Sequence, residues 1–126
     1  MEKLKDKLVI ARFMNRQIFG DGEFTSYEIG MSDGKRYLSD AYEDYNDIMS
    51  IVDKIESLKT PITNNPNLIG EFETYEIEIF CNVVNVFAHG EVTKDICQIK
   101  KPTKKLSVYE ACLEFINWYN QRYNNI

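Results

Sequence analysis

The sequence has a single histidine, His89, among its 126 residues. Nucleophilic catalysis of the Ser-His-Asp or Cys-His type would therefore depend on that one side chain. Gly90 follows it, which favours a turn in contact with solvent. The sequence also lacks a GxSxG nucleophile motif and the glycines of a phosphate-binding loop. We assign no catalytic residue and expect no nucleotide hydrolysis of the phosphate-loop type.

Cysteine is scarce as well. Cys81, Cys97 and Cys112 are odd in number, far apart and without a CxxC pair. This spacing fits neither a disulfide framework nor a zinc site. Because a free cysteine packs as a small hydrophobe, we expect buried free thiols.

Metal-binding motifs are not evident either. One acidic cluster lies near the start of a predicted helix and consists of Asp40, Glu43, Asp44 and Asp47. It lacks EF-hand spacing, and acidic side chains at a helix N-terminus are favoured by the helix dipole. We therefore assign no metal site and no cofactor.

Long apolar runs are also missing. No stretch approaches the roughly 20 apolar residues that cross a bilayer. The opening MEKLKDKLVIARFM lacks the uninterrupted apolar core and cleavage site of a signal peptide. We therefore expect a cytoplasmic protein. The formal net charge of −5 argues against general nucleic-acid binding, which requires a basic face.

The sequence does contain enough apolar material for one core, with 44% hydrophobic and 13% aromatic residues, which predicts a single domain over residues 1–126. The clearest predicted element is a helix over Leu106 to Tyr123, where apolar residues recur at helical spacing. Ser107 is its expected N-cap, with Glu110 completing a capping box. The apolar arc covers roughly 220°, more than a surface helix needs. We expect this helix to lie between a sheet and either another helix or a second subunit.

A second amphipathic helix is predicted over 41–58, followed by a loop over 59–70. Three strands follow, at 74–79, 82–88 and 92–99, and their short links predict an antiparallel meander.

The N-terminal part is less regular. Residues 2–15 favour a helix because they contain no Gly or Pro, although 7–14 could form a strand from their β-branched content. Residues 24–29 and 36–38 predict a weak hairpin with a turn at Asp33-Gly34. The whole pattern predicts an α+β fold, a layered α/β sandwich in which an antiparallel sheet of three to five strands packs with three helices.

Three segments resemble the phage ABA sandwich domain family, small proteins of phages and prophages. They are IARFMN at 10–15, YNDIMSIVDKIESL at 45–58 and VYEACLEFINWYNQ at 108–121. Where the family has a Trp-rich start to its middle helix, this sequence has Tyr42 and Tyr45. The resemblance implies layers of helix, sheet and helix and a phage or mobile-element origin. It carries no catalytic residue to this chain.

Four lysines precede the last predicted helix, namely Lys100, Lys101, Lys104 and Lys105. Positive charge there opposes the helix dipole, so helix stability does not explain it. Together with free amide donors, these lysines predict a site for a phosphate, a nucleotide or an acidic partner surface. The alternative is a solvated loop.

Aromatic residues exceed what one small core comfortably buries, and Tyr and Trp are favoured at interfaces. We predict a homodimer or partner interface that includes Tyr109, Trp118 and Tyr123. The alternative is that these rings line the core between helix and sheet.

The sequence therefore predicts a small non-enzymatic binding or interaction protein whose partner is another protein or a second copy. An enzyme, or a protein that binds a small anion or nucleotide through the lysines, is the alternative. A deep pocket lined by His89, the acidic cluster or the lysines would favour that alternative.

Overall fold

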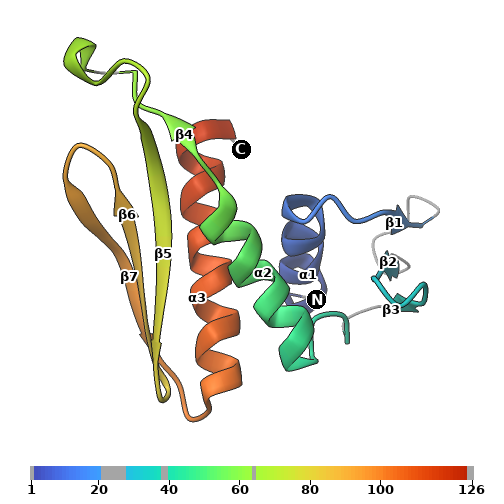
Figure 1. Cartoon of the computed structure of the whole chain (residues 1–126). Coiled ribbons are helices and arrows are strands. Elements are labelled where there is room, and N and C mark those ends of the chain that lie inside the picture. Colours follow the sequence, from blue (N-terminus) through green and yellow to red (C-terminus); the bar gives the residue numbers. More distant parts are fainter. Residues whose placement is uncertain (1, 21–27, 38–39, 64, 125–126) are drawn as a thin grey trace. The chain divides into compact units, whose positions relative to one another are not determined.

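The computed structural model describes residues 2–20, 28–37, 40–63 and 65–124 (Figure 1). These residues form three α-helices and two antiparallel sheets, one of three strands and one of four. The predicted α+β class is confirmed. Contacts divide the chain into two compact units, an N-terminal unit, Met1–Asp47, and a C-terminal unit, Ile48–Ile126. No helix of the described residues is both long enough and apolar enough to span a membrane.

The N-terminal unit contains a helix and a small sheet. Helix α1, Glu2–Phe13, answers the open question at 7–14 in favour of a helix. The sheet has the order β1-β2-β3, with bounds Ile18–Phe19, Glu28–Gly30 and Arg36–Tyr37. The predicted turn between β2 and β3 is confirmed, since Gly34 has a φ of 82° and its N–H bonds to the carbonyl oxygen of Met31 at 3.0 Å. Residues 24–27 and 38 of the predicted hairpin lie outside the described residues.

A buried lysine ties α1 to the segment before α2. Lys7 is 1% exposed, donates to the carbonyl oxygen of Ala41 and lies 3.5 Å from Glu43 Oε2. Asp44 Oδ1 accepts from the N–H of Asn46 at 2.7 Å, at the start of α2. Two members of the acidic cluster therefore have structural roles.

Helix α2, Tyr45–Ser57, leads into the C-terminal unit and buries Ile48, Ile51, Val52 and Ile55, as its periodicity predicted. The four-stranded sheet that follows has the order β4-β5-β6-β7, with bounds Thr60–Pro61, Phe72–Phe80, Val83–His89 and Thr93–Lys100. The predicted meander is confirmed, and β4 extends it by a short strand. The predicted loop also contains a 3₁₀ turn, η1, Pro66–Leu68.

Helix α3, Lys104–Tyr119, packs on β6 and β7, and a π-helical turn, η2, Asn120–Asn124, continues it (Figure 1). Alternation along the strands gives the sheet one buried face, formed by Tyr75, Ile77, Val84, Val86 and Ala88. The buried residues of α3 are Ser107, Val108, Ala111, Cys112, Leu113, Phe115 and Ile116. Their wide distribution around the helix agrees with the broad apolar arc read from the sequence.

The start of α3 differs from the prediction. Thr103 is the N-cap, and its Oγ1 accepts from the N–H of Leu106 at 3.2 Å. Ser107 is instead buried, where its Oγ accepts from the N–H of Lys101 at 2.8 Å and donates to the carbonyl oxygen of Asn82 at 2.6 Å. The predicted cap at Ser107 was wrong because Thr103 supplies an equivalent hydroxyl one turn earlier.

The cysteines also differ in burial. Cys112 is buried and Cys97 half-buried, and burial raises their thiol pKa values to about 12 and about 11, respectively. Cys81 is exposed, which contradicts the expected burial. The reason is its place in the tight turn between β5 and β6, where its φ is 54°.

Candidate functional site

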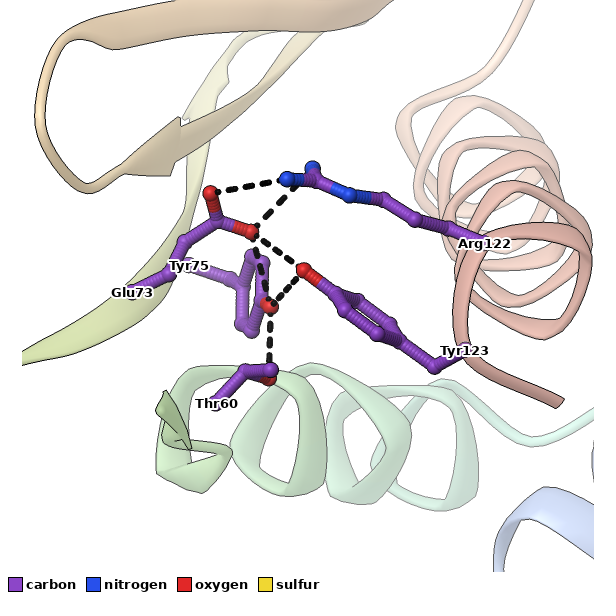
Figure 2. Close-up of polar contacts among 5 residues, drawn as sticks. All are labelled: Thr60, Glu73, Tyr75, Arg122 and Tyr123. Atoms are coloured by element: carbon purple, nitrogen blue, oxygen red, sulfur yellow. Dashed lines mark hydrogen bonds and ion pairs between the residues drawn. The ribbon is translucent and has the colours of Figure 1, made fainter. Parts of the chain in front are cut away.

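A buried carboxylate, Glu73 of β5, is the centre of a polar cluster at one end of the four-stranded sheet (Figure 2). Glu73 is 8% exposed. Its Oε1 lies 3.2 Å from Arg122 Nη1, and its Oε2 accepts from Arg122 Nη2 at 3.4 Å. The hydroxyls of Tyr75 and Tyr123 donate to Oε1 at 3.0 and 2.9 Å. These contacts compensate the carboxylate charge, whose burial would otherwise be costly.

Strand alternation and the end of the last helix bring these residues together. Glu73 has the same strand parity as Tyr75 and therefore lies on the buried face of β5. Arg122 and Tyr123 come from η2, which carries them over that face beyond the last turn of α3 (Figure 2). Thr60 Oγ1 of β4 lies 2.7 Å from the Tyr75 hydroxyl. The cluster thus joins β4, β5 and η2.

Two aromatic rings hold the guanidinium of Arg122. Its Cζ lies 4.9 Å from the ring centroid of Trp118 and 5.1 Å from that of Tyr123. A guanidinium has five N–H donors, and Glu73 occupies only two of its nitrogens. The side chain is 36% exposed, so remaining donors can reach a ligand. Arg122 is consequently a fixed cation with unused hydrogen-bonding capacity.

The tyrosine hydroxyls of this cluster stay protonated. Burial raises the pKa of Tyr75 well above its ordinary value, and the Glu73 carboxylate raises it further. Burial also raises the pKa of Tyr123, and Glu73 adds to that rise. Both hydroxyls are therefore donors to Glu73 and not bases.

We expect the raised pKa of Tyr75 to make the protein less stable in alkali. The unfolded state loses this proton near pH 10.0, whereas the folded state retains it. The stabilisation is therefore complete below pH 10.0 and is lost as the pH rises above it, by up to about 1.4 kcal/mol per pH unit for one proton. Urea unfolding gives the free energy of unfolding at several pH values above 10.0. Plotted against pH, this free energy should fall less steeply in Tyr75→Phe than in the parent, by the equivalent of about one proton. Equal slopes would contradict the assignment.

A cavity of about 280 Å³ opens beside the cluster and is called the sheet-end pocket below. Its charged lining residues are Glu73, Glu91, Lys94 and Arg122, and its apolar ones include Pro61 and Val92. Lys94 pairs with Ala88 in the sheet register, on the face that carries Tyr75. Asn65 Nδ2 donates to Glu91 Oε1 at 2.8 Å, which links the loop after β4 to the turn between β6 and β7.

The predicted anion-binding lysines lie at the far end of β7 from this pocket. Lys100 ends β7, Lys101 lies in the link, and Lys104 and Lys105 form the first turn of α3. All four are exposed and none lines the sheet-end pocket. The structure does not bring them together with Arg122 or Lys94.

The predicted interface residues separate into two groups. Trp118 and Tyr123 pack within the chain, with ring centroids 6.4 Å apart, and Trp118 also contacts Tyr75 and Phe115. Tyr109 is half-buried on α3. Tyr123 therefore belongs to the Glu73 cluster, and Trp118 supports it.

His89 ends β6 instead of standing in an exposed turn. Its ring is half-buried on the sheet face opposite Tyr75, stacked on Phe87. Its Nε2 lies 2.7 Å from Glu76 Oε1, and its Nδ1 lies 3.1 Å from Thr93 Oγ1. This series of carboxylate, imidazole and hydroxyl was missed because its members come from three strands. None of the three lines the sheet-end pocket, so we interpret the series as cross-strand contacts.

The acidic cluster offers no metal site. Within the part of the chain that the structure describes, no three His, Cys, Asp or Glu side chains gather closely enough to hold an ion. Burial and the nearby Asp44 and Asp33 raise the pKa of the Asp47 carboxyl.

Comparisons with protein-family models, with curated proteins and with solved structures found no match. The functional argument therefore depends on the chemistry of the side chains.

Proposed function

We propose that this protein is a small non-enzymatic binding protein whose sheet-end pocket holds a small zwitterion, such as a free amino acid. The observation that carries the proposal is the mixed charge of the lining. Arg122 and Lys94 offer cations to a carboxylate, and Glu91 offers an anion to an ammonium group. A ligand with a single charge would leave one of these groups without a counter-charge.

Arg122 is the proposed binding partner of the ligand carboxylate. Guanidinium and carboxylate match as planar, two-point partners, and such charge-assisted hydrogen bonds are strong. Glu73, Trp118 and Tyr123 already hold the side chain, so binding would order few additional groups. Pre-organisation of this kind favours affinity.

Glu91 is the proposed partner of the ligand ammonium. Asn65 is a neutral donor and leaves the Glu91 charge uncompensated. Neither Glu91 nor Lys94 forms an ion pair with another of the described residues. The cavity of about 280 Å³ is near the lower end of the range for ligand pockets, which suits a single small molecule.

The lining also supports binding over catalysis. Its described residues include no Ser, Cys or His, and the carboxylate of Glu73 is occupied by Arg122 and two tyrosines. Catalysis with a Ser or Cys nucleophile would lack that nucleophile there, and the proposal assigns the remaining charged side chains, Glu91 and Lys94, to the charges of the ligand. The resemblance to phage ABA sandwich proteins supports a phage or mobile-element origin as part of the same proposal. The predicted homodimer is a separate point, and light scattering measures whether the protein self-associates.

Calorimetry with the free amino acids tests the proposal. For the amino acid that binds best, we expect its amide and its des-amino analogue each to bind about tenfold or more weakly, because each loses one charge-assisted contact. Lys94→Gln and Glu91→Gln should each weaken binding by about the same factor.

The Lys104→Gln/Lys105→Gln variant is the matched control, since it also removes positive charge but lies at the other end of β7. It should bind like the parent. Binding that survives in Lys94→Gln and disappears in the control would move the site to the predicted lysines. If no amino acid binds the parent, the proposal is wrong.

A further inference from the structure

The N-terminal unit contains a second cavity, of about 360 Å³, whose chemistry is different. It is called the arginine pocket below. Its polar lining side chains are Asn15, Arg16, Gln17 and Arg36. Among the described residues, two arginines and no acidic residue line it, in a chain whose net charge is −5. The cavity is therefore a locally positive site in an acidic protein.

Arg16 lines the cavity and has one buried donor atom. Its backbone N–H bonds to the carbonyl oxygen of Ala11 at 2.8 Å, just after α1, and this fixes where the side chain begins. The side-chain Nε–H is buried and donates a hydrogen bond to none of the described residues. Buried polar groups in folded proteins are nearly always hydrogen-bonded. Burial raises the pKa of the Tyr42 hydroxyl and the nearby Arg16 side chain opposes that rise, so Tyr42 is a neighbour of this guanidinium within the protein.

Arg36 is held against a ring. Its Cζ lies 3.6 Å from the ring centroid of Phe19, across the small sheet. Stacking fixes the guanidinium plane and leaves its N–H edge available. Gly30 lies between them in the sheet order, and a Cβ there would come within 3.1 Å of Phe19 Cε2. Because Gly30 has no side chain, the Phe19 ring can lie close to the β2 backbone, where the Arg36 guanidinium stacks on it.

Two described acidic residues, Asp33 next to the lining residue Gly34 and Asp47, do not themselves line the cavity. Asp33 is engaged by the Tyr37 hydroxyl at 2.6 Å and by the N–H of Lys35 at 2.9 Å. Asp47 is close enough for Arg16 to affect its pKa, but it does not line the cavity. Both arginines therefore bring positive charge to the lining of the cavity.

From these observations we propose that the arginine pocket binds a phosphate monoester group. Guanidinium forks match phosphate oxygens in two-point contacts, and a dianion satisfies both arginines. The group could belong to free phosphate or to a mononucleotide, and the experiment separates the two. A nucleic acid is disfavoured by the net charge of −5. This proposal is independent of the sheet-end pocket and of its ligand.

The test is calorimetric titration of the intact protein with inorganic phosphate and with adenosine monophosphate, at constant ionic strength set by chloride. We expect binding of both if the phosphate group alone is recognised, and tighter binding of the nucleotide if the cavity also holds its base. Arg36→Gln should weaken binding by about tenfold to a hundredfold, as expected for a lost charge-assisted contact. Arg36→Lys should recover only part of the loss, because a lysine cannot form the two-point contact.

Lys35→Gln is the matched control, because Lys35 is an exposed neighbouring cation that does not line the cavity. It should bind phosphate like the parent. The proposal is overturned if neither ligand binds the parent, if Arg36→Gln binds as the parent does, or if Lys35→Gln loses as much affinity. Because Arg36 is exposed, its replacement leaves the fold intact, and circular dichroism verifies this.

Discussion

Replacing Phe115 by alanine is expected to lower the free energy of unfolding by about 3–5 kcal/mol, the range for a buried phenylalanine. Phe115 is 0% exposed on the inner side of α3. Its ring centroid lies 5.1 Å from that of Tyr75, 5.8 Å from Trp118 and 5.6 Å from Tyr119. Truncation would leave a cavity among rings that cannot all move inward, because Tyr75 is also held by hydrogen bonds. Urea unfolding followed by circular dichroism measures the change.

Phe80→Ala is the matched control, since Phe80 is 72% exposed at the end of β5. Surface substitutions usually change stability by no more than about 0.5 kcal/mol. A similar loss in both variants would show that Phe115 does not have the packing described. A loss below about 1 kcal/mol at Phe115 would also contradict the prediction, because it would indicate a site that collapses around the missing ring.

The second large effect is expected at Glu73. Glu73→Ala should lower the free energy of unfolding by about 2–4 kcal/mol, because Arg122 and the hydroxyls of Tyr75 and Tyr123 lose their shared acceptor. We place the value below the upper range for buried ion pairs because Arg122 is 36% exposed and water can solvate it. The same variant removes the carboxylate that positions the Arg122 guanidinium. It should therefore weaken ligand binding in the sheet-end pocket.

Glu78→Ala provides the comparison at Glu73. Glu78 is on the same strand with an exposed side chain, and it accepts one hydrogen bond from Asn85 at 3.2 Å. Its loss should change stability by no more than about 0.5–1 kcal/mol. The double variant Glu73→Ala/Arg122→Ala should recover part of the lost stability, since it no longer leaves an unpaired cation. Strict additivity of the two single changes would contradict a direct interaction between them.

The helices and the meander could be predicted from the sequence because their signals are local. Apolar residues at helical spacing predicted α2 and α3, and alternation after residue 74 predicted β5. Errors occurred where two residues offered the same chemistry, as Thr103 and Ser107 do for the cap of α3. The turn position of Cys81 was missed because a cysteine was assumed to follow its average burial.

The candidate sites could be predicted only in part. The parity of β5 already placed Glu73 on the side of Tyr75 and Ile77, where an acidic residue is unexpected and needs a partner. No local pattern names that partner, since Arg122 is 49 residues away and reaches it through the π-helical turn. The lysines stood out in the sequence because they are adjacent, yet they lie at the far end of β7 from the pocket.

The amino-acid order by itself thus determined which segments are helices and strands and which side of each is apolar, because periods of two and 3.6 residues are properties of short segments. Only the tertiary structure decided that Lys94 and Glu91 share a cavity with Arg122, and that Arg16 and Arg36 share another. Charge pairs and cavities form where segments distant in the sequence contact one another. Tertiary packing, and not any local pattern, decides which segments make those contacts.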